Sequence, residues 1–119
     1  MKPEDKELLL KDLCARLPYK VIVCDDMKRV YTLTLGTSYL IDLFYSNGDY
    51  VDVPIKPYLR PMSSMTEEEK EQTRDLWIDA DTKTHATRLI DFYNKHHFDH
   101  RGLIDKGLAI EVTEDNNPY

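Results

Sequence analysis

The sequence predicts a single α+β domain over residues 1–119: a helix at the start, a three- to four-stranded antiparallel meander, two further helices and a short C-terminal strand. Apolar residues recur at helical spacing near the start of the chain and again in its last third. In the segment between, they alternate with the period of two that is typical of strands. A chain of 119 residues has the size of one domain and is long enough to bury a core.

The composition excludes some classes of protein. Apolar residues make up 41% of the chain and charged residues 32%, which is typical of a globular rather than a disordered protein. The net charge of −6 argues against nucleic acid as a partner, because binding to the phosphate backbone needs clustered lysine and arginine. The same charge is compatible with a protein partner that has a basic surface.

The cysteines and the N-terminus indicate the compartment. Cys14 and Cys24 lie among apolar neighbours, so we expect two buried free thiols in a reducing environment. The chain begins with MKPEDKE, which is unlike a secretory signal, and no apolar run approaches the length of a membrane span. We therefore expect a cytoplasmic protein without membrane contact.

The first element is predicted to be a helix over residues 3–17, which Pro18 ends. The apolar stripe of this helix has the spacing i, i+3, i+4, i+7 and consists of Leu10, Leu13, Cys14 and Leu17.

Short segments rich in β-branched and aromatic residues then predict the meander: 19–24, 29–36, 38–45 and 50–55. Asn47-Gly48 is the preferred pair for a type I′ turn, in which both central residues have positive φ, and it predicts a hairpin between the last two segments. Pro54 cannot donate to a ladder, so we expect the last strand to lie at an edge or to end there.

The second half is predicted to contain an extended linker (56–65), two helices (66–78 and 84–97), a strand (108–112) and a frayed tail (112–119). Thr66 and Glu69 have the spacing of a capping box, which marks the start of a helix. Gly102 and Gly107 stand where helix ends or tight turns need a positive φ.

Three of the four histidines lie in FYNKHHFDHRG, residues 92–102. On a continuous helix His96 and His100 would share a face, as two zinc ligands do, and His97 and Asp99 could add ligands. The alternative is the polar end of a helix, where histidines interact with the helix dipole and free carbonyls. A helix that ends near His97 breaks the i, i+4 geometry. We therefore favour the second interpretation and expect no cofactor.

The segment KPYLRPMSS is the candidate binding loop, because prolines limit the entropy lost on binding and Tyr and Arg are common at interaction hot spots. Its candidate residues are Tyr58, Arg60, Met62, Ser63 and Ser64. The alternative is a structural strap between sheet and helix, with Tyr58, Leu59 and Met62 in the core.

The chain has eight tyrosines, several of them in the predicted meander. Exposed tyrosines on a small sheet can stack on bases, but they more often form cross-strand pairs, and no lysine or arginine cluster flanks them. The sequence contains no phosphate-binding loop, dinucleotide fingerprint, CxxC, HExxH or GxSxG motif.

Three segments resemble a group of small uncharacterised proteins from phages and prophages of gut Bacteroidales: KELLLKDLCARLPY, KPYLRPMSSMTEEEKE and HHFDHRGLIDKGLAIE. The resemblance covers both ends and the middle of the chain and implies an accessory protein made inside a bacterial cell, without a known activity. Residue 100 departs from the group, because it is histidine here and more often tyrosine there. This departure argues against a shared site that uses His100.

We therefore expect a non-enzymatic accessory protein that binds a host or phage protein, as a monomer or a small homo-oligomer. A small metal-dependent enzyme that uses the histidine segment is the first alternative. A nucleic-acid-binding module that uses the tyrosine-bearing sheet is the second.

Overall fold

The computed structural model describes residues 3–25, 28–34, 55–78 and 82–119, without the side chains of 77–78 and 82–85. In chain order the elements are α1 (Pro3–Arg16), η1 (Leu17–Tyr19), β1 (Ile22–Cys24), β2 (Val30–Thr32), β3 (Lys56–Leu59), η3 (Met62–Ser64), α3 (Glu67–Ile78), α4 (Thr82–Lys95) and β4 (Ile110–Glu111). The predicted strand over 38–45, the Asn47-Gly48 turn and Pro54 lie outside the described residues.

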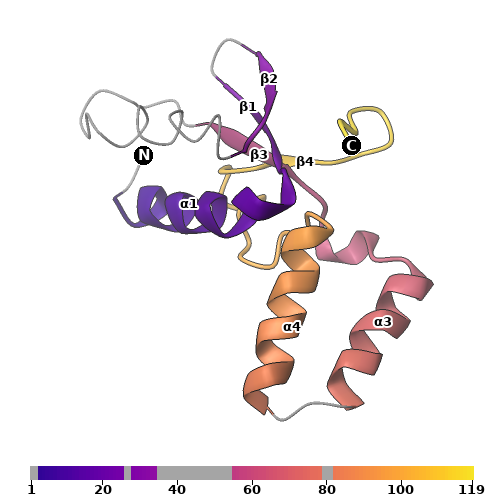
Figure 1. The fold of residues 1–119 in the computed structure, drawn as a ribbon. Coiled ribbons are helices and arrows are strands. Elements are labelled where there is room, and N and C mark those ends of the chain that lie inside the picture. Colours follow the sequence, from indigo (N-terminus) through magenta and orange to yellow (C-terminus); the bar gives the residue numbers. More distant parts are fainter. Residues whose placement is uncertain (1–2, 26–27, 35–54, 79–81) are drawn as a thin grey trace.

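The four described strands form one mixed sheet in the order β2-β1-β3-β4 (Figure 1). β1 pairs antiparallel with β2 and with β3, whereas β4 pairs parallel with β3. The α+β class, the N-terminal helix and the further helices are confirmed. The antiparallel pairing of β1 with β2 is also as predicted. The sheet as a whole is mixed and not an antiparallel meander, because the chain passes through α3 and α4 before β4 joins β3 in the same direction.

β3 comes from the segment that was predicted to be a linker, and it lies between two other strands although it contains Pro57. The carbonyl of Leu59 accepts a hydrogen bond from Val112 N at 2.8 Å, so Pro57, two residues earlier, also directs its backbone toward β4. Pairing with β4 begins only at Tyr58. The missing N–H of Pro57 therefore falls just before that ladder, where a proline is tolerated.

One apolar core joins α1, the sheet and the turn that precedes β4. Its buried side chains are Leu9, Leu13, Val21, Val23, Leu33, Ile55, Leu59, Leu103 and Leu108. The buried face of α1 is displaced from the predicted stripe, because Asp12 and Arg16 are fully buried with Leu9 and Leu13. Cys14 is consequently exposed, which corrects the expectation of two buried thiols, whereas Cys24 is buried and both cysteines are free.

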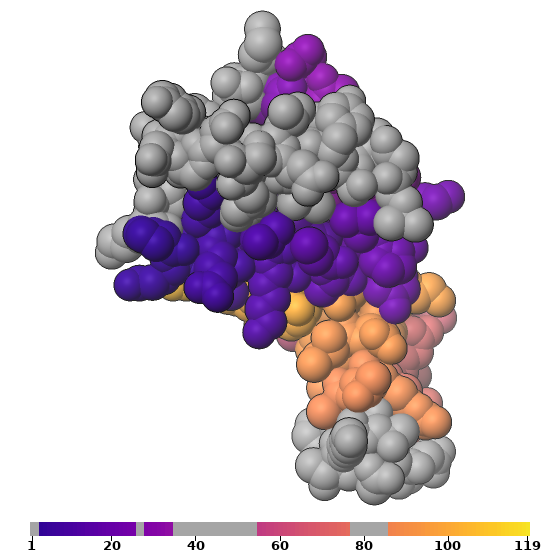
Figure 2. All heavy atoms as spheres, turned by 60° about the vertical axis from the view of Figure 1, so that its left-hand side comes forward, coloured from indigo at the N-terminus to yellow at the C-terminus, as the bar shows by residue number. Residues whose placement is uncertain are grey.

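α3 and α4 form a helical hairpin that projects from the body made by α1 and the sheet (Figures 1 and 2). The capping box at the start of α3 is confirmed: Glu69 N donates to Thr66 Oγ1 and Thr66 N donates to Glu69 Oε1. α4 ends at Lys95, two residues before the predicted boundary. Within the described ranges, none of the helices is both long and apolar enough to cross a membrane.

Candidate functional site

The end of α4 determines the geometry of the histidine segment. His97 has a φ of 63°, in the left-handed region that glycine usually occupies after a helix. Phe98 N donates to Tyr93 O at 2.8 Å and His97 N donates to Asn94 O at 3.2 Å, which together form a Schellman motif. His96 and His100 therefore do not lie one helical turn apart on a common face.

The three histidines contact different partners. The His96 ring packs on Phe92, with centroids 4.4 Å apart, and His96 Nδ1 lies 3.8 Å from a carboxylate oxygen of Glu69. The His97 ring stacks on Tyr119, whereas His100 Nε2 lies 3.0 Å from Asn94 Oδ1.

Asp99, the fourth candidate ligand, uses both carboxylate oxygens within its own loop. Its Oδ1 accepts a hydrogen bond from Leu103 N at 2.8 Å and its Oδ2 accepts one from Ile104 N at 2.9 Å. In the part of the chain that the structure describes, no three His, Cys, Asp or Glu side chains are grouped so that they could hold a metal ion. The geometry instead gives Asp99 a role in shaping the turn before Leu103.

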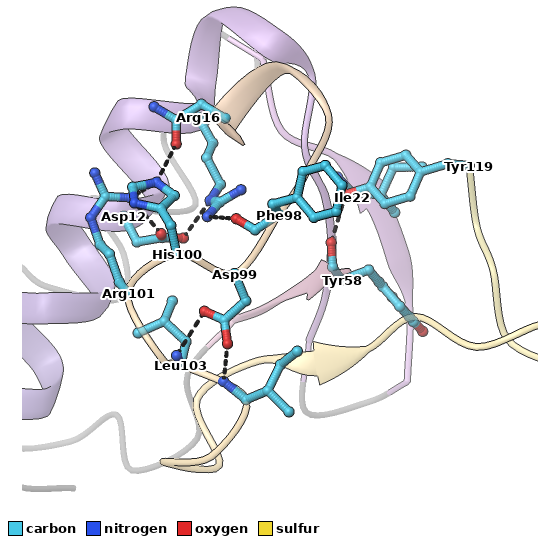
Figure 3. A network of polar contacts seen from close by, with 12 residues as sticks. Asp12, Arg16, Ile22, Tyr58, Phe98, Asp99, His100, Arg101, Leu103 and Tyr119 are labelled. Carbon is cyan, nitrogen blue, oxygen red and sulfur yellow. Dashed lines mark hydrogen bonds and ion pairs between the residues drawn. The ribbon is translucent and has the colours of Figure 1, made fainter. Parts of the chain in front are cut away.

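A buried charged network joins α1 to this loop (Figure 3). Asp12 Oδ2 accepts from Arg16 Nε at 2.9 Å and Asp12 Oδ1 accepts from Arg101 Nη1 at 2.7 Å. Arg16 also donates to the carbonyl of Phe98. One fully buried carboxylate thus binds two guanidinium groups, which ties the first helix to residues 98–101.

Sequence reasoning missed this network, because a charged pair on a short helix is usually solvent-exposed. The only available signal was the i, i+4 spacing of Asp12 and Arg16, which is common in surface pairs.

Burial and nearby cations keep two histidines neutral. Burial lowers the pKa of His97 from 6.5 to about 4, and the Arg16 charge adds to this effect. Burial lowers the pKa of His100 to about 4, with further contributions from Arg101 and Arg16 that the carboxylate of Asp12 partly offsets. The two rings are therefore uncharged at neutral pH.

Within the candidate binding loop, the guanidinium of Arg60 makes its contacts with other residues of the same chain. Its guanidinium makes two hydrogen bonds of 2.8 Å to the carboxylate of Glu69, donates to Ser64 O and lies 4.2 Å from the centroid of the Phe98 ring. These hydrogen bonds from Arg60 are the largest cause that lowers the pKa of Glu69 to about 2. Arg60 thus fixes the loop against α3.

The other loop residues are divided between strand and turn. Tyr58 is half-buried in β3, whereas Met62, Ser63 and Ser64 form the exposed turn η3. Ser64 Oγ donates to Pro61 O at 2.7 Å, which holds the turn in place. The exposed surface of the loop is therefore narrower than the sequence indicated and consists of the residues of η3.

A groove of about 300 Å³ lies between this loop and the C-terminal segment. Its lining residues are Arg60, Ser64, Val112, Thr113, Glu114 and Asn117. Asn116 folds the C-terminal side of the groove, because its side chain accepts from Thr113 N at 2.6 Å and donates to Glu111 O at 2.9 Å.

Tyr119 fastens the end of the C-terminal segment to the sheet. Its hydroxyl accepts a hydrogen bond from Ile22 N at 3.0 Å and donates one to Tyr58 O at 2.8 Å (Figure 3). Its ring lies parallel to the His97 imidazole, with centroids 3.8 Å apart and an interplanar angle of 11°. Sequence patterns gave no signal for these contacts, because the residues that make them are far apart in the chain.

The chain matches no protein-family model, and neither the curated proteins nor the solved structures contain one that is similar to it.

Proposed function

We propose that the protein is a non-enzymatic phage or prophage accessory protein that binds a host or phage protein in the cytoplasm of a bacterial cell. The observation that carries the proposal is the groove between η3 and residues 112–117. Of the residues of η3, Ser64 lines the groove, and Met62, two residues earlier in the same turn, is an exposed apolar side chain. Exposed apolar residues beside a groove of fixed shape are typical of binding surfaces.

The frame around the groove supports this function. The ion pair between Arg60 and Glu69 and the hydrogen bond from Ser64 to Pro61 hold the loop in one conformation. A partner that binds a loop of this kind loses little affinity to the ordering of side chains and backbone. Arg60 therefore acts as a positioning residue, and Met62, Ser63 and Ser64 make the contacts.

The test is capture of a partner by tagged protein from a lysate of a gut Bacteroidales host, with nuclease and chelator present. Met62→Glu places a charge on the exposed apolar side chain, and Ser64→Arg fills the groove. We expect each to reduce capture at least tenfold, because a buried unpaired charge costs more than about 1.4 kcal/mol. Glu7→Arg, an exposed change on α1, is the control and should leave capture unchanged.

Arg60→Ala separates the structural role from the binding role. We expect it to lower the melting temperature and to reduce capture only through this loss of order. Equal capture by the wild-type protein, Met62→Glu and Ser64→Arg would show that the groove is not the binding surface.

A further inference from the structure

The phenol of Tyr119 lies where β1 and β3 separate. Val23 is paired with Pro57, so the next opposed residues along the two strands are Ile22 and Tyr58. The amide of Ile22 donates to the Tyr119 hydroxyl, which donates in turn to the carbonyl of Tyr58. A side-chain hydroxyl thus bridges two backbone groups that a continuous ladder would join directly.

The segment 97–99, which pairs with Arg60, does not donate a hydrogen bond to the carbonyl of Tyr58. Arg60 N donates to His97 O at 2.7 Å and Asp99 N donates to Arg60 O at 2.9 Å, which is a parallel bridge on the same edge of β3. If this pattern continued, His97 N would donate to Tyr58 O. His97 N instead donates to Asn94 O at the end of α4. The backbone therefore provides an acceptor and, at Ile22, a donor at one junction.

The ring of His97 completes the junction. Its left-handed backbone conformation and the Schellman motif fix its position, and burial keeps it neutral by lowering its pKa to about 4. Burial also raises the pKa of Tyr119 to about 12, although the residue as a whole is 43% exposed. The hydroxyl is the end of this side chain that is held by the sheet, through its bonds to Ile22 and Tyr58.

Donor, acceptor and stacking ring together match a phenol and do not match a phenyl ring, which would leave both backbone groups without a partner. We propose that Ile22, Tyr58 and His97 form a binding site for a tyrosine side chain, which Tyr119 occupies in this structure and which a tyrosine of a partner peptide occupies when residues 113–119 open. The site uses other residues than the proposed groove, but opening of the C-terminal segment also removes the groove wall that Thr113, Glu114 and Asn117 form. The peptide test below reads this site alone and does not need the partner of the groove.

The C-terminal segment is suited to exchange. Residues 113–117 are exposed, and the hydrogen bonds of Asn116 and Asn117 are local, within residues 111–119. A side chain tethered in this way competes at an effective concentration of roughly millimolar. A peptide in solution therefore binds measurably only when the tethered ring is removed or weakened.

The test uses the full-length Tyr119→Ala variant and a labelled peptide with the sequence of residues 112–119, VTEDNNPY, titrated by fluorescence anisotropy. We expect saturable binding that is about tenfold tighter than that of the same peptide ending in phenylalanine, because the phenol makes two additional hydrogen bonds. We expect binding to the wild-type protein to be at least tenfold weaker, because Tyr119 competes. Adding His97→Asn to Tyr119→Ala should weaken binding, since asparagine tolerates the left-handed conformation and lacks the ring.

A second variant keeps the test decisive if Tyr119→Ala does not fold. Tyr119→Phe retains a tethered ring without the hydroxyl, so the tyrosine peptide should bind it more tightly than it binds the wild-type protein. The proposal is overturned if neither variant binds the peptide, as expected if β1 and β3 close directly onto each other. Equal affinity for the tyrosine and phenylalanine peptides overturns it too, because the hydroxyl would then contribute nothing.

Discussion

Asp12 is the residue whose charge the buried network depends on most. It is fully buried and accepts hydrogen bonds from Arg16 and Arg101. Asp12→Asn keeps the shape but leaves two cations with no carboxylate, so we expect it to lower the free energy of unfolding by about 3–5 kcal/mol. Urea unfolding followed by circular dichroism measures this change.

The matched control for this prediction is Glu7→Gln, which removes the same charge from an exposed position of α1. It should change the free energy of unfolding by no more than about 0.5 kcal/mol. If both variants lose the same stability, the loss reflects the net charge of the protein rather than the buried network.

At the residue scale, the sequence predicts backbone features better than burial. The positive φ of Gly102 and Gly107 follows from the absence of a side chain and is confirmed. The apolar stripe of α1 was misplaced because the assignment took apolar residues to be the buried ones. Asp12 and Arg16 satisfy each other's charge, and their burial depends on residues 98–101, which local patterns do not reveal.

At the scale of single elements, the start of α3 depends on Glu69. Its carboxylate both caps Thr66 N and binds Arg60. We expect Glu69→Ala to lower the free energy of unfolding by about 2 kcal/mol, roughly half from the cap and half from the partly buried ion pair. Glu68→Ala removes an exposed glutamate from the same first turn and should cost no more than about 0.5 kcal/mol.

Thermal unfolding of the two variants distinguishes local from general effects. Both substitutions remove one negative charge from the N-terminal turn of α3, so they change its interaction with the helix dipole equally. A loss of stability that is the same in Glu68→Ala and Glu69→Ala would contradict the role assigned to the Arg60 contact.

The helices were predicted well because the sequence signals for a helix are local. The pairing of strands was predicted less well. The capping box of α3 lies within four residues and identified the start of that helix correctly. β3 was predicted as a linker because Pro57 argues against a ladder. Whether a proline is tolerated in this strand depends on where β4 begins to pair with it. That information comes from a segment about 50 residues further along the chain, so a local pattern could not contain it.

The candidate sites show the same division. The break in the helix near His97 was predicted correctly, because helix-end residues act locally. The candidate binding loop was proposed from its prolines, which also act locally. The groove needs residues 112–117 beside the loop, and the phenol site needs β1, β3 and the end of α4 together. Both depend on the complete fold, which brings segments from opposite ends of the chain into contact.

At the scale of the whole molecule, the buried neutral histidines predict a loss of stability in mild acid. His97 and His100 have a pKa of about 4 in the folded protein and of about 6.5 in the unfolded chain. As the pH falls from about 6.5 toward 4, the unfolded chain therefore binds more protons than the folded protein, and the free energy of unfolding decreases. Above about pH 6.5 this contribution to stability is fully present.

Glu69 affects the stability of the fold in a lower pH range, separate from that of the two histidines. Its pKa is lowered from 4.5 to about 2, so its contribution to stability is present above about pH 4.5 and is lost as the pH falls toward 2. A comparison between about pH 7.5 and about pH 5 therefore reports mainly on the histidines.

Urea unfolding of the wild-type protein and of the double variant His97→Asn, His100→Gln at these two pH values tests this prediction. Asparagine tolerates the left-handed conformation of residue 97, and glutamine can bond to Asn94 and Arg101 without titrating. The wild-type protein should lose stability at the lower pH, and the double variant should lose less. His96 retains part of the effect, because burial also lowers its pKa. An unchanged pH dependence in the double variant would mean that other groups cause the loss, and the packing of the His97 and His100 rings would then have no part in the acid sensitivity of the fold.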